Sequence, residues 1–144
     1  MAKIIVSGCL MGFECRYKGD SRVCDEIVAL SKDNTLIFIC PEQMGGLATP
    51  RDPAEQVGDR VITNHGADVT AQYEKGAQAA LKLALMNKAD FAILKSRSPS
   101  CGSGVIYDGT YSGTLTSGDG VCARLFKQHG IPVYTEEELD KLPL

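Results

Sequence analysis

The sequence has no long apolar run, no excess of basic residues and no closely spaced pair of cysteines. No apolar stretch among the 144 residues approaches the roughly 20 that a membrane-spanning helix needs. A net charge of -3 argues against a general nucleic-acid binder or a protein that binds anionic membrane surfaces. The apolar stretch at Lys3–Val6 is too short for a signal peptide, so we expect a cytoplasmic protein. The absence of a CxxC pair excludes the linear zinc-ribbon and ferredoxin motifs.

The sequence does contain six cysteines. In a reducing compartment, cysteines are more often free thiols, metal ligands or catalytic groups than disulfides. The role of each cysteine therefore has to be inferred from its position relative to the predicted strands and helices.

Short apolar runs alternate with helical patterns along the whole chain. This alternation predicts an α/β, single-domain, three-layer Rossmann-like fold over residues 1–144, with a small, mainly parallel sheet of about four strands. We expect strands at 3–6, 35–39, 91–94 and 132–134, and helices at about 23–30, 70–86 and 121–128. Asp20 or Ser21 should cap the first helix, and a capping box at Thr135–Glu138 should open a terminal one. Two short elements are expected near 55–57 and 60–63, and a hairpin with its turn at Asp108–Gly109 over 104–113.

Three cysteines follow three of the predicted strands. Cys9 comes just after the first strand, Cys40 directly after the second, and Cys101 in the polar turn that follows 91–94. Ligands of parallel sheets bind beyond the carboxyl ends of the strands, so these thiols should converge at one edge. We call Cys9, Cys40 and Cys101 the cysteine trio. Its convergence is compatible with a metal or cluster site, a redox relay or coincidence, and no fourth thiol or histidine stands at a comparable position.

Five motifs occur in order along nearly the whole chain: Ser7-Gly-Cys-Leu-Met-Gly12, Cys15-Arg-Tyr-Lys-Gly19, Cys40-Pro-Glu-Gln-Met-Gly-Gly-Leu47, Pro50-Arg-Asp-Pro-Ala-Glu55 and Lys95-Ser-Arg-Ser-Pro-Ser-Cys-Gly102. Together they resemble the bacterial family long catalogued as domain of unknown function 523. Its characterised members are thiouracil desulfidases, which convert 2-thiouracil to uracil and hold a 4Fe–4S cluster by three cysteines, with the fourth iron free.

The resemblance implies an iron–sulfur-dependent desulfidase acting on a thiolated small molecule. It places the cluster on the cysteine trio, with the open iron accepting the substrate sulfur. It also implies a catalytic carboxylate, here Glu42, as acid or base. A catalytic serine belongs to the Ser-Pro-Ser-Cys motif; we expect Ser100 in that role and Ser98 in substrate binding. The cluster of this family can be lost in aerobic preparations.

Cationic and aromatic residues near these motifs suggest a binding site. Arg16, Tyr17, Arg51 and Lys95, together with Arg97, could bind the substrate or could equally form a solvated rim. The alternatives to a desulfidase are a non-catalytic domain that binds anionic small molecules, and a zinc or thiol redox protein. We expect Cys15, Cys24 and Cys122 to be packing residues or spare thiols, outside the site.

Overall fold

Four parallel strands form the centre of the molecule in a computed structural model that describes all 144 residues. They are β1 (Lys3–Ser7), β2 (Thr35–Ile39), β5 (Phe91–Leu94) and β8 (Val133–Thr135), in the order β2-β1-β5-β8. The predicted small parallel sheet is confirmed. β1 and β5 are almost wholly buried, which explains why both read as continuous apolar runs.

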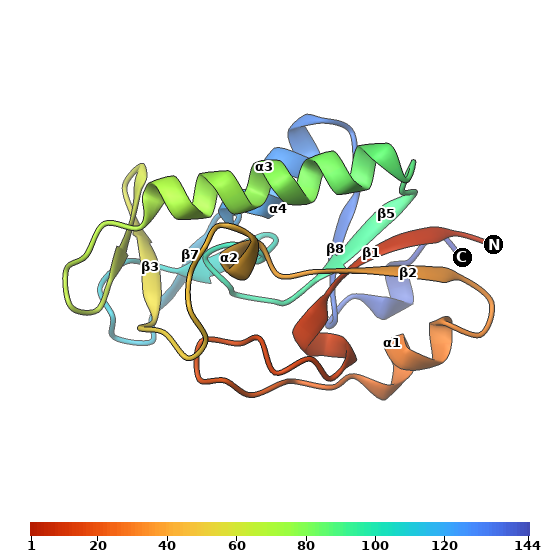
Figure 1. Cartoon of the computed structure of the whole chain (residues 1–144), viewed down its shortest axis with the longest axis horizontal. Coiled ribbons are helices and arrows are strands. Elements are labelled where there is room, and N and C mark those ends of the chain that lie inside the picture. The colour runs from red at the N-terminus through yellow and green to blue at the C-terminus, as the bar shows by residue number, and fades with distance from the viewer.

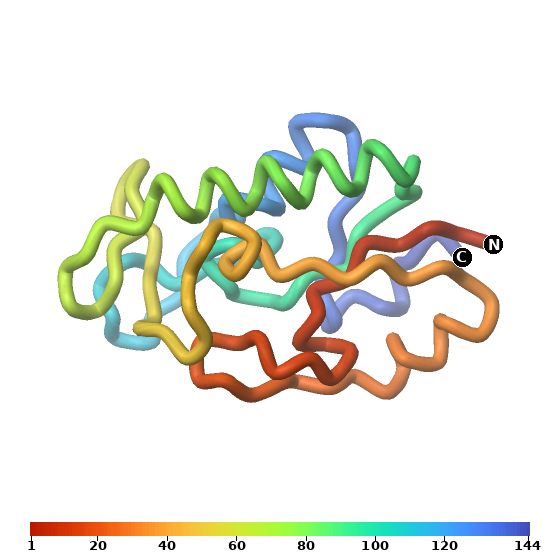
Figure 2. Tube along the Cα trace, viewed as in Figure 1, coloured from red at the N-terminus to blue at the C-terminus, as the bar shows by residue number.

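Helices cover the sheet on both faces, as the three-layer prediction required. On one face lie α3 (Thr70–Met86) and α4 (Val121–Gln128), and on the other lie α1 (Asp25–Leu30) with the 3-10 helices η1 (Gly8–Met11) and η2 (Leu139–Lys141) (Figure 1). The alternation of β1 shows this division, because Ile5 belongs to the core under α3 and α4 while Ile4 and Val6 belong to the opposite core. Both termini lie at the same end of the molecule (Figure 2). None of the helices has the length and apolar character needed to cross a bilayer.

Two hairpins and one short helix stand at the carboxyl end of the sheet. The hairpins pair β3 (Ala54–Val57) with β4 (Arg60–Thr63) and β6 (Val105–Tyr107) with β7 (Leu115–Ser117). The short helix, α2 (Pro41–Met44), begins directly after β2 and packs against α3.

The contact between α2 and α3 depends on two glycines. A Cβ atom on Gly76 would lie 1.7 Å from the carbonyl oxygen of Pro41, and one on Gly45 would lie 1.9 Å from the carbonyl oxygen of Gln72. No side chain fits at either position, so the two backbones touch directly. The end of β2 is thereby fixed against the longest helix of the molecule.

The helices predicted at 70–86 and 121–128 are confirmed to the residue, but three other local predictions were wrong. The first helix begins at Asp25, and Cys24 rather than Asp20 or Ser21 occupies its N-cap position. Asp20 instead pairs with Arg16, 2.8 Å away, and this ion pair closes the turn over residues 16–20.

The predicted hairpin turn and terminal helix also differ from the structure. Tyr107 pairs with Leu115, so the hairpin loop is longer than a turn at Asp108–Gly109. The capping box does form, since Thr135 N donates to Glu138 Oε1 at 3.0 Å and Glu137 N donates to Thr135 Oγ1 at 3.2 Å. Only the 3-10 turn η2 follows it, because the chain reaches Pro143 within a few residues.

Candidate functional site

The structure brings the cysteine trio to one cavity. Cys40, Cys9 and Cys101 follow β2, β1 and β5, which are neighbours in the sheet and run in the same direction. All three residues line a cavity of about 380 Å³ beyond the carboxyl ends of these strands. Convergence at the sheet edge, inferred above from strand ends alone, is therefore present in the fold.

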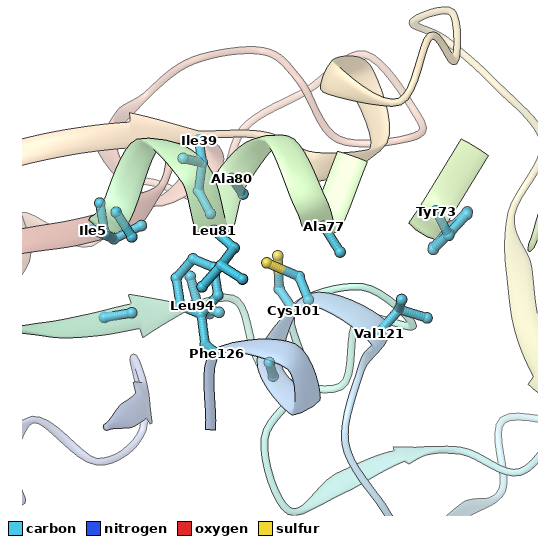
Figure 3. Packing of buried hydrophobic residues seen from close by; sticks show 14 of the residues in the cluster. Ile5, Ile39, Tyr73, Ala77, Ala80, Leu81, Leu94, Cys101, Val121 and Phe126 are labelled. Carbon is cyan, nitrogen blue, oxygen red and sulfur yellow. The ribbon is translucent and has the colours of Figure 1, made fainter. Parts of the chain in front are cut away.

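Cys101 is anchored in the larger core. It lies between α3 and α4, among Ala77, Leu81 and Val121 (Figure 3). Burial raises the pKa of its thiol to about 12, although nearby hydroxyl groups of Ser7 and Ser100 lower it. In the metal-free chain the thiol therefore keeps its proton at neutral pH, and iron would have to displace that proton on binding.

Cys9 and Cys40 meet a fourth thiol, that of Cys15, which was predicted above to be a packing residue or a spare thiol. Cys15 is buried, lines the same cavity and lies against the sulfur atoms of both Cys9 and Cys40. The Cys40 thiol also donates to the Cys15 carbonyl oxygen at 3.6 Å. The side-chain contact with Cys15, together with burial, raises the pKa of Cys40. The other two cysteines lie apart from the cavity, Cys24 at the start of α1 and Cys122 in the larger core.

The donor set of the cavity is not gathered around the position of a single metal ion. No three His, Cys, Asp or Glu side chains are close enough together to hold one metal ion. Sulfur ligands of a single zinc sit about 2.3 Å from it and so nearly touch one another. In a 4Fe–4S cluster each cysteine binds a different iron, which places the sulfurs farther apart.

A buried hydroxyl group provides a further test of this fit. Ser100 is completely buried, and its Oγ has no nitrogen or oxygen partner. The hydroxyl lies beside the thiol of Cys101. Hydrogen-bond donors that face a ligating thiolate are typical of metal sites, so the residues present fit an iron–sulfur cluster.

Glu42 lies in the cavity wall and is held there by two donors. Tyr73 OH donates to Glu42 Oε1 at 2.7 Å, and Arg51 Nε donates to the same oxygen at 3.1 Å. The Glu42 side chain is 17% exposed and the Arg51 side chain 8%. Although burial lowers the pKa of Arg51, the neighbouring Glu42 carboxylate outweighs it and raises that pKa. The remaining oxygen, Oε2, accepts no hydrogen bond from the protein and can face a guest molecule.

The cations predicted to bind substrate line the cavity, but each is paired with a carboxylate. Arg51 pairs with Glu42 and also donates to the carbonyl oxygens of Cys15 and Ala48 and to Thr49 Oγ1. The remaining ion pairs are Arg16–Asp20 at 2.8 Å, Lys95–Glu136 at 3.0 Å and Arg97–Glu137 at 2.7 Å. This pairing leaves no uncompensated positive charge at the cavity, which counts against an anion-binding domain.

The two serines of the Ser-Pro-Ser-Cys motif lie differently. Ser98 lines the cavity, and its Oγ accepts from Ser100 N at 3.1 Å and from Cys101 N at 3.0 Å. Its hydroxyl proton is therefore free to point at a guest. Ser100, predicted above as the catalytic serine, lies behind the wall and not on it.

Several residues of the wall were not singled out for the site from the sequence, among them Ser7, Cys15, Tyr73 and Tyr107. Tyr17, which was predicted, also lines the cavity. Ser7 ends β1 and accepts from Lys95 N at 2.9 Å. Ser7 could have been predicted as a wall residue from the sequence, because it ends an apolar run and lies two residues before Cys9. Tyr73 carried no signal beyond its place on the buried face of a helix.

Comparisons with known proteins agree with this geometry. The family model described as 2-thiouracil desulfurase matches residues 4–138. The uncharacterized protein YbbK of Bacillus subtilis (strain 168) is 43% identical, over 96% of this chain and 99% of its own. A solved structure, the [4Fe-4S]-dependent thiouracil desulfidase TudS (DUF523Vcz), matches with 46% identity and a TM-score of 0.94, over 99% of this chain and 95% of its own.

Proposed function

Because this chain belongs to the 2-thiouracil desulfurase family, we propose that it removes the sulfur atom from a thiolated small molecule such as 2-thiouracil. The overall reaction exchanges the C=S bond of the substrate for C=O, consumes one water and releases one hydrogen sulfide. No electrons are transferred. The enzyme would thus be a hydrolase of a carbon–sulfur bond.

One observation carries the proposal: three cysteines that follow three neighbouring strands share a cavity with a partly buried, hydrogen-bonded carboxylate. We assign Cys9, Cys40 and Cys101 as the residues that would hold a 4Fe–4S cluster. When bound, such a cluster supplies a Lewis-acidic iron that attracts sulfur.

Glu42 is the group of the chain placed to move protons. Arg51 and Tyr73 both donate to Oε1, which leaves Oε2 as the free acceptor of the carboxylate. Oε2 can then accept a proton from the attacking water and return it to the leaving sulfur. General acid–base catalysis of this kind typically contributes about 10²–10⁴-fold.

Ser98 and the apolar part of the wall orient the substrate and limit access of water. The Ser98 hydroxyl can donate to an oxygen or nitrogen of a heterocycle, because its own oxygen already accepts two backbone N–H groups. Ile39, Pro41, Pro53 and Ala54 form an apolar part of the cavity wall. A neutral, planar ring suits these walls and the paired cations of the rim.

The test is anaerobic reconstitution with ferrous iron and sulfide, followed by an assay of uracil and hydrogen sulfide released from 2-thiouracil. We expect turnover by the reconstituted protein and none by the metal-free protein. Glu42→Gln should keep the iron content and lose at least about 10²-fold in kcat.

Gln43→Ala is the matched control, because Gln43 is exposed on the same helix and bonds only Thr49. It should retain activity. A reconstituted wild-type protein without uracil release from any thiopyrimidine would refute the proposed function. Full activity in Glu42→Gln would refute only the role of Glu42.

A further inference from the structure

We propose that Tyr73 is a positioning residue that fixes the carboxylate of Glu42 so that its free oxygen faces the cavity; this inference rests on the function proposed above. Tyr73 belongs to α3 and Glu42 to α2, so the sequence places them 31 residues apart. Tyr73 belongs to none of the sequence motifs from which the site was predicted.

The hydrogen bonds of Glu42 are asymmetric. Tyr73 OH at 2.7 Å and Arg51 Nε at 3.1 Å both reach Oε1, and no donor reaches Oε2. A single donor would leave the carboxylate free to tilt about its hydrogen bond. Two donors that approach one oxygen from different elements fix both the position of the carboxylate and the plane in which Oε2 lies.

The backbone contact between α2 and α3 determines where the Tyr73 hydroxyl lies. Tyr73 precedes Gly76 by three residues, so both lie on the same face of α3. Gly76 touches the carbonyl of Pro41, the residue before Glu42. The close approach that the glycine allows therefore brings the tyrosine of the same face to the carboxylate.

The Tyr73 hydroxyl has a single hydrogen-bond partner, which is Glu42. The residue is 1% exposed and packs within the larger core. Removal of the hydroxyl alone preserves the packing of the ring. Tyr73→Phe therefore separates positioning of Glu42 from stability of the core.

The experiment compares Tyr73→Phe with Tyr134→Phe in protein reconstituted with iron and sulfide, using 2-thiouracil as substrate. Tyr134 packs edge-on against Phe91 in the other core, with ring centroids 5.7 Å apart. We expect Tyr73→Phe to lower kcat about tenfold, equivalent to roughly 1.4 kcal/mol, with little change in KM. Iron content and Tm should stay close to those of the wild type, and Tyr134→Phe should have wild-type kcat.

A double-mutant cycle distinguishes positioning from a general structural effect. If Tyr73 acts through Glu42, then Tyr73→Phe should cause no further loss in a Glu42→Gln background. An equal loss in both backgrounds, or an unchanged kcat in the single variant, would overturn the inference while the proposed function stands.

Crystal structures of wild-type and Tyr73→Phe protein give a readout that does not depend on turnover. The Glu42 carboxylate should shift or become disordered in the variant, while Arg51 keeps its contact with the Cys15 carbonyl. If the carboxylate superposes on that of the wild type, Tyr73 does not position it. Absence of turnover in the wild type would count against the proposed function, and the crystal structures would still decide the role of Tyr73.

Discussion

The two faces of the sheet contribute to the cavity in different ways. Under α3 and α4 lies a core of 17 buried residues that includes Cys101 and Tyr73. The opposite core has 8 buried residues, among them Cys9 and Cys15, with Cys40 packed against it. The site is thus built across a large core under two long helices and a small one covered by α1, η1 and η2.

This difference shows how the two sets of thiols are held. Cys101 is fixed by burial and by the start of α4, whose Cys122 N and Ala123 N donate to the Ser100 carbonyl oxygen. Cys15 sits in a loop, and its carbonyl is held by Arg51 from 36 residues away. Substitutions on the larger face should therefore affect stability most, and those on the smaller face mainly the site.

The largest effect expected is the loss of iron when any member of the cysteine trio is changed to alanine. Each variant removes one of three ligands, so reconstituted protein should contain little iron. Iron per chain, measured after gel filtration, tests this. Cys24→Ala is the control and should bind iron as the wild type does; full iron content in any trio variant would contradict the assignment.

Gly76→Ala should have the next largest effect, through stability of the larger face. The new Cβ would overlap the Pro41 carbonyl oxygen, so the two helices must separate. We expect a loss of about 3 kcal/mol in the free energy of unfolding, measured by urea denaturation. Lys75→Ala, at the exposed neighbouring position, should change it by less than about 0.5 kcal/mol. Similar values for the two variants would show that the helix contact is not tight.

The same substitution should have opposite effects on the two faces. Cys122→Ser places a hydroxyl in a fully buried apolar site and should cost about 2 kcal/mol. Cys24→Ser places serine at the N-cap of α1, where it is a preferred residue, and should stabilise by up to about 1 kcal/mol. Thermal unfolding of the metal-free variants measures both. Equal losses of stability in the two variants would contradict the predicted difference between the two faces.

The smallest effect concerns Asp68, an exposed residue outside both cores whose carboxylate accepts from Thr70 N at the start of α3. Hydrogen bonds from the Thr70 side chain and backbone and from Arg60 lower its pKa from 3.8 to about 2. Since the folded pKa is the lower one, its contribution to stability is present above pH 3.8 and lost as pH falls toward 2. Asp68→Asn should therefore lower the Tm slightly at pH 6 and not at pH 2. A difference in Tm that stays constant from pH 6 to pH 2 would show that the charged form of Asp68 does not stabilise the start of α3.

Much of the fold could be predicted from local patterns. The strands are short apolar runs, and α3 has a continuous apolar stripe, so periodicity alone placed its ends correctly. The positions of Cys9, Cys40 and Cys101 after strands were sufficient to predict that they converge. The register of β6 with β7 could not be predicted, because Tyr111 and Gly109 bind Glu55 from a distant hairpin and thus set the loop.

The parts of the site that escaped prediction depend on contacts between distant segments. Cys15 reaches the cavity because Arg51 binds its carbonyl, and Tyr73 reaches Glu42 because two glycines permit a close helix crossing. Neither contact leaves a local pattern. Lys95 and Arg97 were identified as cavity residues, but their partners Glu136 and Glu137 come from a distant segment near the end of the sequence. The neutralisation of these two cations was therefore not predicted.

The crossing of α2 and α3 also determines that the Glu42 carboxylate is ordered when the chain folds and not when substrate binds. Direct contact of two backbones leaves no side-chain rotamers to be frozen between them, so α2 has its final orientation as soon as the chain has folded. The conformational entropy lost in aligning Glu42 is then lost on folding and is not lost again each time a substrate binds. Each encounter with a substrate begins with that carboxylate already in place.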